Sequence, residues 1–100
     1  MRDLKEFYEK YNLNHDYCGQ VIGVGSKSLI KYSNGEKLRE STKKRIEFGI
    51  DVIERFNLVR PSLPAGFYGS HIWKYREWNR ENREYMRKTR ELVEKERVSS

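Results

Sequence analysis

The chain has 100 residues, of which 36% are charged and 36% hydrophobic, and its formal net charge is +6 at pH 7. This length limits it to one small domain with a modest core, and the 13% of aromatic residues exclude a disordered chain. One cysteine excludes an internal disulfide, and neither a signal peptide nor an apolar run of about 18 residues is present. We therefore expect a soluble cytoplasmic protein that has no membrane contact. Its basic charge suits an anionic partner.

The N-terminal segment predicts two short helices. The first, over residues 2–12, has its apolar side chains at helical spacing: Leu4, Phe7, Tyr8 and Tyr11. Asn14 is a good N-cap, and Asp16 places a negative charge in the first turn that follows it. We therefore expect a second helix from near His15 to about Ile22.

A glycine-rich stretch then predicts a turn and a third short helix. A helix that ends at a glycine, here Gly23, usually does so because the chain takes a positive φ there. Gly25 or Ser26 can cap a third helix, which ends before Asn34 and Gly35, a pair suited to a left-handed conformation.

A fourth helix completes the compact part of the chain. Ser41 or Thr42 is its expected cap, and the helix runs to about residue 57. Its buried stripe consists of apolar or small residues: Ile46, Gly49, Ile50, Ile53 and Phe56. The predicted domain spans residues 1–59.

The rest of the chain predicts a linker and one long helix. Residues 60–71 hold both prolines and two glycines, whereas residues 72–97 hold neither residue type. One face of the second segment carries aromatic, apolar and small polar side chains: Tyr75, Trp78, Asn82, Tyr85, Met86, Thr89, Leu92 and Val93. We therefore expect an all-α fold, in which a compact four-helix helix-turn-helix domain is followed by a long amphipathic helix within residues 72–100.

The glycines invite comparison with phosphate-binding loops. Ser26 separates Gly25 from Lys27, whereas the phosphate-loop motif needs glycine and lysine to be adjacent. No strand precedes this segment, and Ser28 occupies the third glycine slot of the dinucleotide fingerprint. A chain this short also has no room for a doubly wound sheet, so we do not expect a nucleotide-binding enzyme.

Residues 14–35 instead combine the features of a helix-turn-helix motif in the required order. The small residue Gly19 allows a close crossing of the two helices, and Gly23 supplies the turn. The inward apolar residues are Cys18, Ile22, Val24, Leu29 and Tyr32. This segment resembles the helix-turn-helix of the lambda-repressor/Cro family of phage and plasmid regulators. Together with the flanking helices, the resemblance spans about residues 2–58. Gly19 stands where this family usually has alanine. The C-terminal part of the chain matches no family pattern.

The resemblance implies that the second helix of the motif lies in the major groove of double-stranded DNA. The family's base-facing slots fall on Ser26, Lys27 and Lys31. Lysine can donate to guanine O6 and N7, and a serine hydroxyl can bond to several bases. The alternative is that the two lysines lie on an ordinary solvated face.

Phosphate contacts would surround this helix. The expected phosphate-facing residues are His15, Asn34, Lys37, Arg39, Lys43 and Lys44. Cations at the start of a helix oppose its dipole, so a nearby phosphate would explain Lys43 and Lys44. A solvated helix start is the alternative for the same residues.

Other chemistry has little support in the sequence. His15 and Cys18 lie three positions apart, but no second pair of ligands completes a metal site, and His71 stands alone in the linker. Glutamates alternate with arginines and lysines, as on ion-paired helix faces. We therefore expect no metal, no cofactor and no enzymatic activity.

The C-terminal helix needs a partner for its apolar face. The expected dimerisation residues are Tyr75, Trp78, Tyr85, Met86 and Leu92. Pairing with the same helix of a second protomer would give a two-fold dimer suited to palindromic half-sites. The alternatives are packing on the chain's own domain, a basic arm on DNA, or docking of a different protein through Trp73 and Trp78.

The leading functional hypothesis is a sequence-specific DNA-binding transcriptional regulator. It would be a repressor of phage or mobile-element type that binds an operator as a homodimer and excludes polymerase. The alternative is a helix-turn-helix protein-interaction module, such as an antitoxin, an adaptor or a phage-encoded inhibitor of host defence, that uses the aromatic C-terminal helix.

Overall fold

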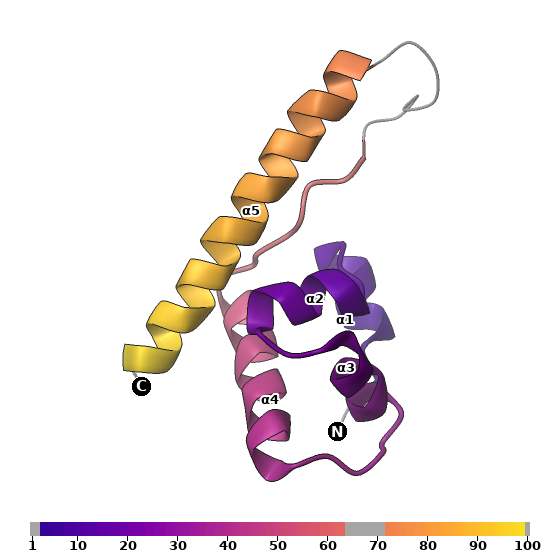
Figure 1. Cartoon of the computed structure of the whole chain (residues 1–100), viewed down its shortest axis with the longest axis vertical. Helices are drawn as coiled ribbons and strands as arrows, with labels where there is room; N and C mark the ends of the chain where they lie inside the picture. Colours follow the sequence, from indigo (N-terminus) through magenta and orange to yellow (C-terminus); the bar gives the residue numbers. More distant parts are fainter. Residues whose placement is uncertain (1–2, 64–71, 100) are drawn as a thin grey trace.

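The protein folds into helices joined by short connections, as seen in a computed structural model that describes residues 3–63 and 72–99 (Figure 1). For residues 72–74 only the backbone is described. The helices are α1 (Lys5–Tyr11), α2 (His15–Ile22), α3 (Ser26–Ser33), α4 (Glu40–Arg55) and α5 (Ile72–Ser99). No strand occurs within the described ranges, which confirms the all-α prediction.

Helix α1 is shorter than predicted because its first turn is replaced by a local cap. The Asp3 carboxylate accepts a hydrogen bond from the backbone N–H of Lys5 at 3.0 Å. At the other end Asn12 takes a left-handed conformation with φ of 55°, which stops the helix. The backbone N–H of Leu4 donates to the Ser33 hydroxyl at 3.3 Å, so the start of α1 lies beside the end of α3.

The predicted ends of α2 are correct because both depend on local chemistry. The Asn14 side chain accepts a hydrogen bond from the backbone N–H of Tyr17 at 2.8 Å. Gly23 has φ of 87°, and its N–H donates to the carbonyl of Gly19 at 2.8 Å. The chain then enters α3 through Gly25, as predicted.

Gly19 allows the turn to close onto α2. A Cβ atom at this position would lie 2.6 Å from the carbonyl oxygen of Val24, which is backbone and has little room to move. The backbone N–H of Val24 also donates to the Gly19 carbonyl at 3.0 Å. The absence of a side chain at Gly19 is therefore a steric requirement of this turn.

Helix α4 begins earlier than predicted. Its N-cap is Arg39, which has an extended backbone and forms no side-chain capping bond, so Ser41 and Thr42 lie inside the first turn instead of capping it. Leu38, which immediately precedes this cap, is partly buried against the core. The sequence signal for a cap was therefore wrong, because tertiary packing sets the boundary.

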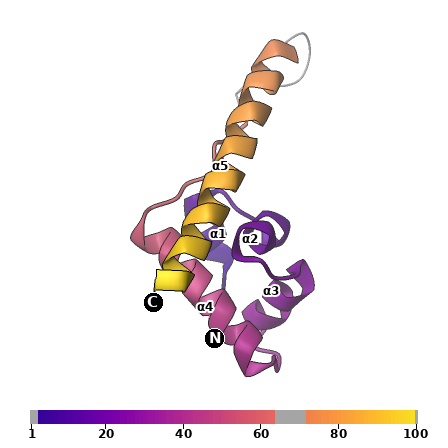
Figure 2. The same ribbon diagram turned by 60° about the vertical axis from the view of Figure 1, so that its left-hand side comes forward.

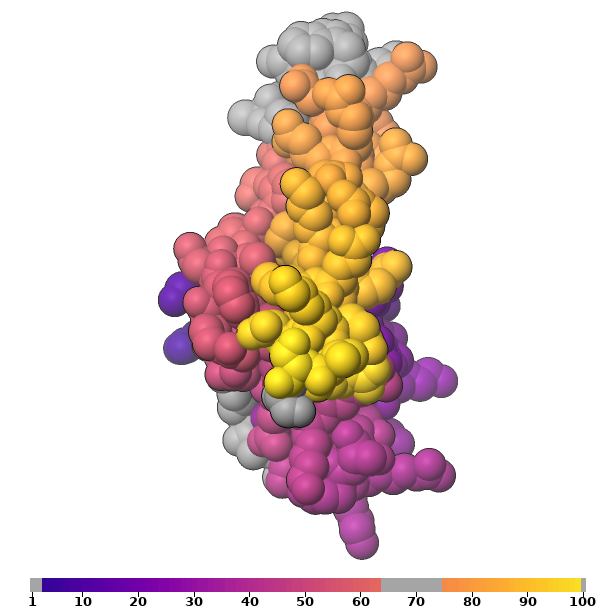
Figure 3. Space-filling view, turned by 90° about the vertical axis from the view of Figure 1, so that its left-hand side faces the viewer, coloured from indigo at the N-terminus to yellow at the C-terminus, as the bar shows by residue number. Residues whose placement is uncertain are grey.

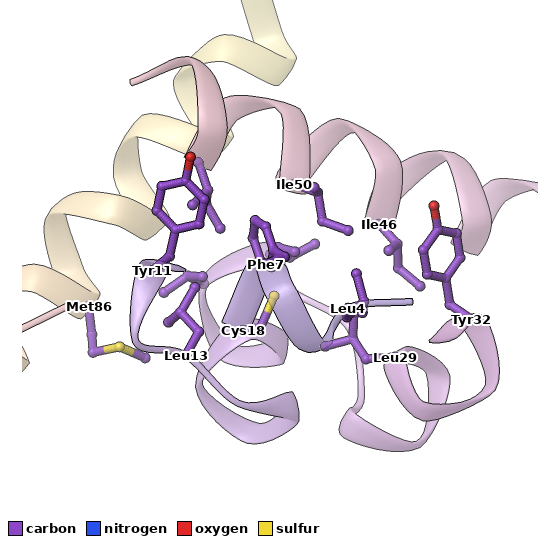
Figure 4. Close-up of a cluster of buried hydrophobic side chains, with 13 residues drawn as sticks. Leu4, Phe7, Tyr11, Leu13, Cys18, Leu29, Tyr32, Ile46, Ile50 and Met86 are labelled. Atoms are coloured by element: carbon purple, nitrogen blue, oxygen red, sulfur yellow. The ribbon is translucent and has the colours of Figure 1, made fainter. Parts of the chain in front are cut away.

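The core lies between α1, α2, α3 and α4 (Figure 4). Phe7 and Cys18 lie in its middle, and Met86 reaches it from α5. Gly49 lets α4 approach α2 closely, because a Cβ atom there would lie 2.5 Å from the Ile22 side chain. The buried members are Leu4, Phe7, Tyr11, Leu13, Cys18, Val21, Ile22, Leu29, Tyr32, Ile46, Ile50, Val52 and Ile53.

Helix α5 packs across α2 and α4 of its own chain (Figures 1 and 2). Figure 3 shows it lying along α4 and the residues that follow α4. Its buried residues are Trp78, Asn82, Met86, Thr89 and Val93. Its N-terminal part extends beyond the four-helix body, and Tyr75 in that part is 41% exposed. No described helix is both long enough and apolar enough to cross a membrane.

Arg60, in the segment after α4, contacts the end of α1 and also α2 and α5. Its backbone N–H donates to Tyr11 O at 3.0 Å and its Nε to Asn12 O at 2.9 Å. One guanidinium nitrogen donates to Asn82 Oδ1 at 2.8 Å, and the guanidinium lies 4.1 Å from the centre of the Tyr17 ring. Residues 60–62 are therefore packed in place between α1 and α5, while residues 64–71 of the predicted linker lie outside the described ranges.

Two further hydrogen bonds fix α5 against the same segment. The Trp78 indole N–H donates to Pro61 O at 3.1 Å, and the Tyr85 hydroxyl donates to Leu58 O at 2.8 Å. The Asn12 amide donates to Pro61 O at 3.0 Å from the opposite side. Asn82 and Tyr85 thus satisfy polar groups that an apolar stripe would leave unpaired.

Candidate nucleic-acid interface

The outer face of α3 is open to solvent. Leu29 is fully buried and Tyr32 is 2% exposed, so these two residues anchor the helix to the core. Lys27, Ile30, Lys31 and Asn34 are exposed on the opposite side. The structure thus places the predicted base-facing residues Lys27 and Lys31 on one free surface, whereas Ser26 is half-buried.

Helix α5 leaves this face uncovered. Within the described ranges α5 contacts α2 and α4 but not α3, and the two helices lie on different sides of the four-helix body (Figures 1 and 2). The outer face of α3 is therefore accessible in the isolated chain.

The cations around α3 differ from those on α5. Among the described residues, Lys27, Lys31 and Lys37 form no ion pair. On α5, by contrast, Arg87 pairs with Glu84 and also with Glu91, at 2.9 Å in the second case. The positive charge of α5 is thus partly neutralised within its own helix, and that of α3 is not.

The predicted phosphate-facing residues lie on three neighbouring segments. Asn34 ends α3, Lys37 and Arg39 lie in the connection to α4, and both of these cations are exposed. In the first turns of α4, Lys44 is exposed and Lys43 is half-buried. These residues continue the basic surface from α3 towards α4.

His15 has a structural partner. Its Nδ1 is 2.9 Å from the Tyr8 hydroxyl, and the two rings meet edge to face with centroids 5.0 Å apart. This contact orients the imidazole at the start of α2. The predicted phosphate contact is therefore left to the second ring nitrogen and to the backbone of the first turn.

Cys18 is a packing residue, as expected. The thiol is buried beside Tyr8, and burial raises its pKa to about 12. Burial also raises the pKa of Tyr8 above its usual value. A thiol in this setting is a weak nucleophile and a poor metal ligand, and no group of three or more potential metal ligands occurs within the described part of the chain.

A shallow hollow separates α2 from α3. It is lined by Asn14, Asp16, Tyr17, Gln20, Val24 and Ser26. Ser26 belongs to this hollow and not to the most exposed part of α3. The acceptor groups of Asp16 and Ser26 thus lie at one edge of the basic surface.

Two residues near α3 were missed by the sequence analysis. Ile30 is 40% exposed on the outer face, and helical spacing could have shown that it shares this face with Ser26 and Lys27. Arg45 covers the turn, because a Cβ atom at Gly23 would lie 3.3 Å from its guanidinium. No sequence signal links Arg45 to Gly23, which lies 22 positions before it.

The predicted dimerisation residues fall into two groups. Trp78 and Met86 are 8% and 7% exposed and pack against the same chain, as the intramolecular alternative predicts. Tyr85 and Leu92 are half-buried at the border of that contact, and Tyr75 is exposed, with its ring stacked on Trp78. Only the second group has surface left for another protomer, and dimerisation through it stays a prediction.

No protein-family model, no curated protein and no solved structure matches this chain.

Proposed function

We propose that this protein is a sequence-specific DNA-binding transcriptional regulator. The main support for this proposal is the exposure of Lys27 and Lys31 on the outer face of α3. They form no ion pair within the described ranges, and α5 does not cover them. Two donors on one short helix that projects from a packed turn suit the major groove, where guanine presents two acceptors.

Phosphate contacts would hold the helix in the groove. Lys37, Arg39 and Lys44 are exposed near α3, and they would neutralise backbone charge on one side of it. The first turn of α2 would meet phosphate on the other side through backbone N–H groups that the Asn14 cap does not use. The net charge of +6 supports the same partner.

A homodimer on a palindromic operator is part of this proposal. One small domain reads only one half-site, and two copies related by a two-fold axis read two half-sites about one helical turn apart. Tyr75 and Leu92 offer the surface for this pairing. A dimer bound across an operator would repress by excluding polymerase, as in regulators of phages and mobile elements.

The decisive experiment compares two pairs of lysine substitutions. In a gel shift with the DNA upstream of the protein's own gene, Lys27→Ala with Lys31→Ala should weaken binding more than tenfold, since one good base contact contributes ~1–3 kcal/mol. The matched control, Lys88→Ala with Lys95→Ala on α5, removes the same charge far from α3. Equal losses in both double variants would contradict the assigned base contacts.

The interaction module is the second candidate, and the exposed ring of Tyr75 on the projecting part of α5 favours it. Burial of Trp78 against the core removes much of the aromatic surface on which this candidate relied. If the wild-type protein binds no duplex even at low salt, the regulator proposal fails and this candidate replaces it.

A further inference from the structure

Ile30 lies on the outer face of α3 with Lys27 and Lys31. At about 100° per residue around a helix, it falls between Ser26 and Lys27. Its neighbour Leu29 is fully buried, whereas Ile30 is 40% exposed and belongs to no described core contact. The apolar surface of Ile30 therefore lies between Ser26 and Lys27, two of the residues assigned to base contacts.

Among the described residues, no core contact accounts for an isoleucine at this position. A β-branched residue is a weaker helix former than the straight-chain residues common on solvated faces. The other exposed large apolar residues in the described ranges are Phe56, Val59, Leu63, Tyr75 and Val98. They all lie at or after the end of α4, away from α3, so Ile30 is an isolated apolar group within a basic surface.

We infer that Ile30 is a specificity-determining residue that contacts the 5-methyl group of thymine. This inference rests on the proposed binding of α3 in the major groove. The thymine methyl is the apolar group that the base pairs present on that edge, and an aliphatic side chain covers it. Lys27 and Lys31 lie about 60° and 100° further around the helix than Ile30, both on the same side of it, and donate to guanine, so the preferred half-site contains thymine beside guanine.

The test changes only the methyl group. Duplexes with a random centre are selected on the wild-type protein at low salt, and the best binder is synthesised twice, once with thymine and once with uracil, which lacks the methyl but pairs identically. Dissociation constants for both duplexes are measured with the wild type, Ile30→Ala and the control Val98→Ala. Val98 is a 76% exposed apolar residue near the end of α5.

We expect the wild type to bind the uracil duplex about fourfold more weakly for each methyl group contacted, which is the ~0.8 kcal/mol of one buried methylene expressed as an affinity ratio. Ile30→Ala should bind both duplexes equally, and Val98→Ala should keep the wild-type preference.

Two results overturn the inference while leaving the proposed function intact: a wild type that binds both duplexes equally, or an Ile30→Ala variant that still prefers thymine. A wild type that selects no duplex overturns the proposed function and this inference together. Circular dichroism of Ile30→Ala is expected to match the wild type, because the side chain is at the surface.

Discussion

At the scale of single residues, the turn between α2 and α3 depends on the missing side chain of Gly19. A small residue was predicted here from the sequence, but the choice between glycine and alanine was not. That choice depends on the position of the Val24 carbonyl oxygen, 2.6 Å from where a Cβ atom would be. A distance across a turn is set by the folded backbone, and no spacing rule in the sequence contains it.

Gly19→Ala is therefore expected to destabilise the protein, although alanine is the better helix former by about 0.5–1 kcal/mol. Moving a backbone carbonyl costs more than that gain, and we expect a net loss of about 1–3 kcal/mol in the free energy of unfolding. Urea denaturation followed by circular dichroism measures it. Gly25→Ala is the control, because a Cβ atom there meets nothing within 4 Å. A Gly19→Ala variant as stable as the wild type would show that the turn can relax.

At the scale of elements, the ends of α2 and the docking of α5 show what the sequence can and cannot predict. Asn14 and Gly23 act within a few residues of the ends that they set, and both ends of α2 were predicted correctly. The apolar stripe of α5 was also visible in the sequence. The surface against which this stripe packs could not be predicted, because the same stripe can pack against either a second protomer or the chain's own core.

Asn82 shows why the packing of α5 could not be predicted from the sequence. In the sequence it weakens the apolar stripe, but in the structure its Oδ1 accepts a hydrogen bond from Arg60 at 2.8 Å. The two residues lie 22 positions apart, and Arg60 belongs to the segment that was assigned to a linker. Only the folded chain brings the guanidinium of Arg60 to this buried polar residue of α5.

The Arg60–Asn82 contact should contribute measurably to stability. Arg60→Ala leaves Asn82 buried without its charged donor and is expected to lower the free energy of unfolding by about 1–3 kcal/mol. With Asn82→Ala and the double variant, the pair should show a coupling energy of at least about 0.5 kcal/mol. Thermal or urea denaturation provides the measurement. Arg83→Ala is the control, because its side chain is exposed one position further along α5. Strictly additive losses would mean that the two residues act independently.

At the scale of the whole molecule, charge is distributed unevenly over the two sides of the fold. On α5, Arg87, Lys88 and Arg97 pair with glutamates of the same helix, and Arg55 of α4 pairs with Glu96 at 3.1 Å. The lysines around α3 have no such partners among the described residues. This asymmetry could be predicted only in part, because the sequence shows alternating charges on α5 but not which side of the domain α5 covers.

DNA binding should consequently depend steeply on salt. If each protomer neutralises about 4–6 phosphates, the logarithm of the dimer's association constant should fall against the logarithm of salt concentration with a slope of about −7 to −11. Fluorescence anisotropy with a labelled duplex between about 50 and 200 mM salt measures this slope. Half of that slope would indicate a bound monomer. A slope near zero would contradict the phosphate contacts altogether.

The hydrogen bond from Leu4 to Ser33 has a practical consequence for handling the protein. It holds the beginning of the described chain against the C-terminal end of α3, whereas Ser99 ends a helix that does not contact α3. For binding measurements a purification tag is therefore better placed at the C-terminus, since the first described anchor of the N-terminal side is in contact with α3 and that of the C-terminal side is not.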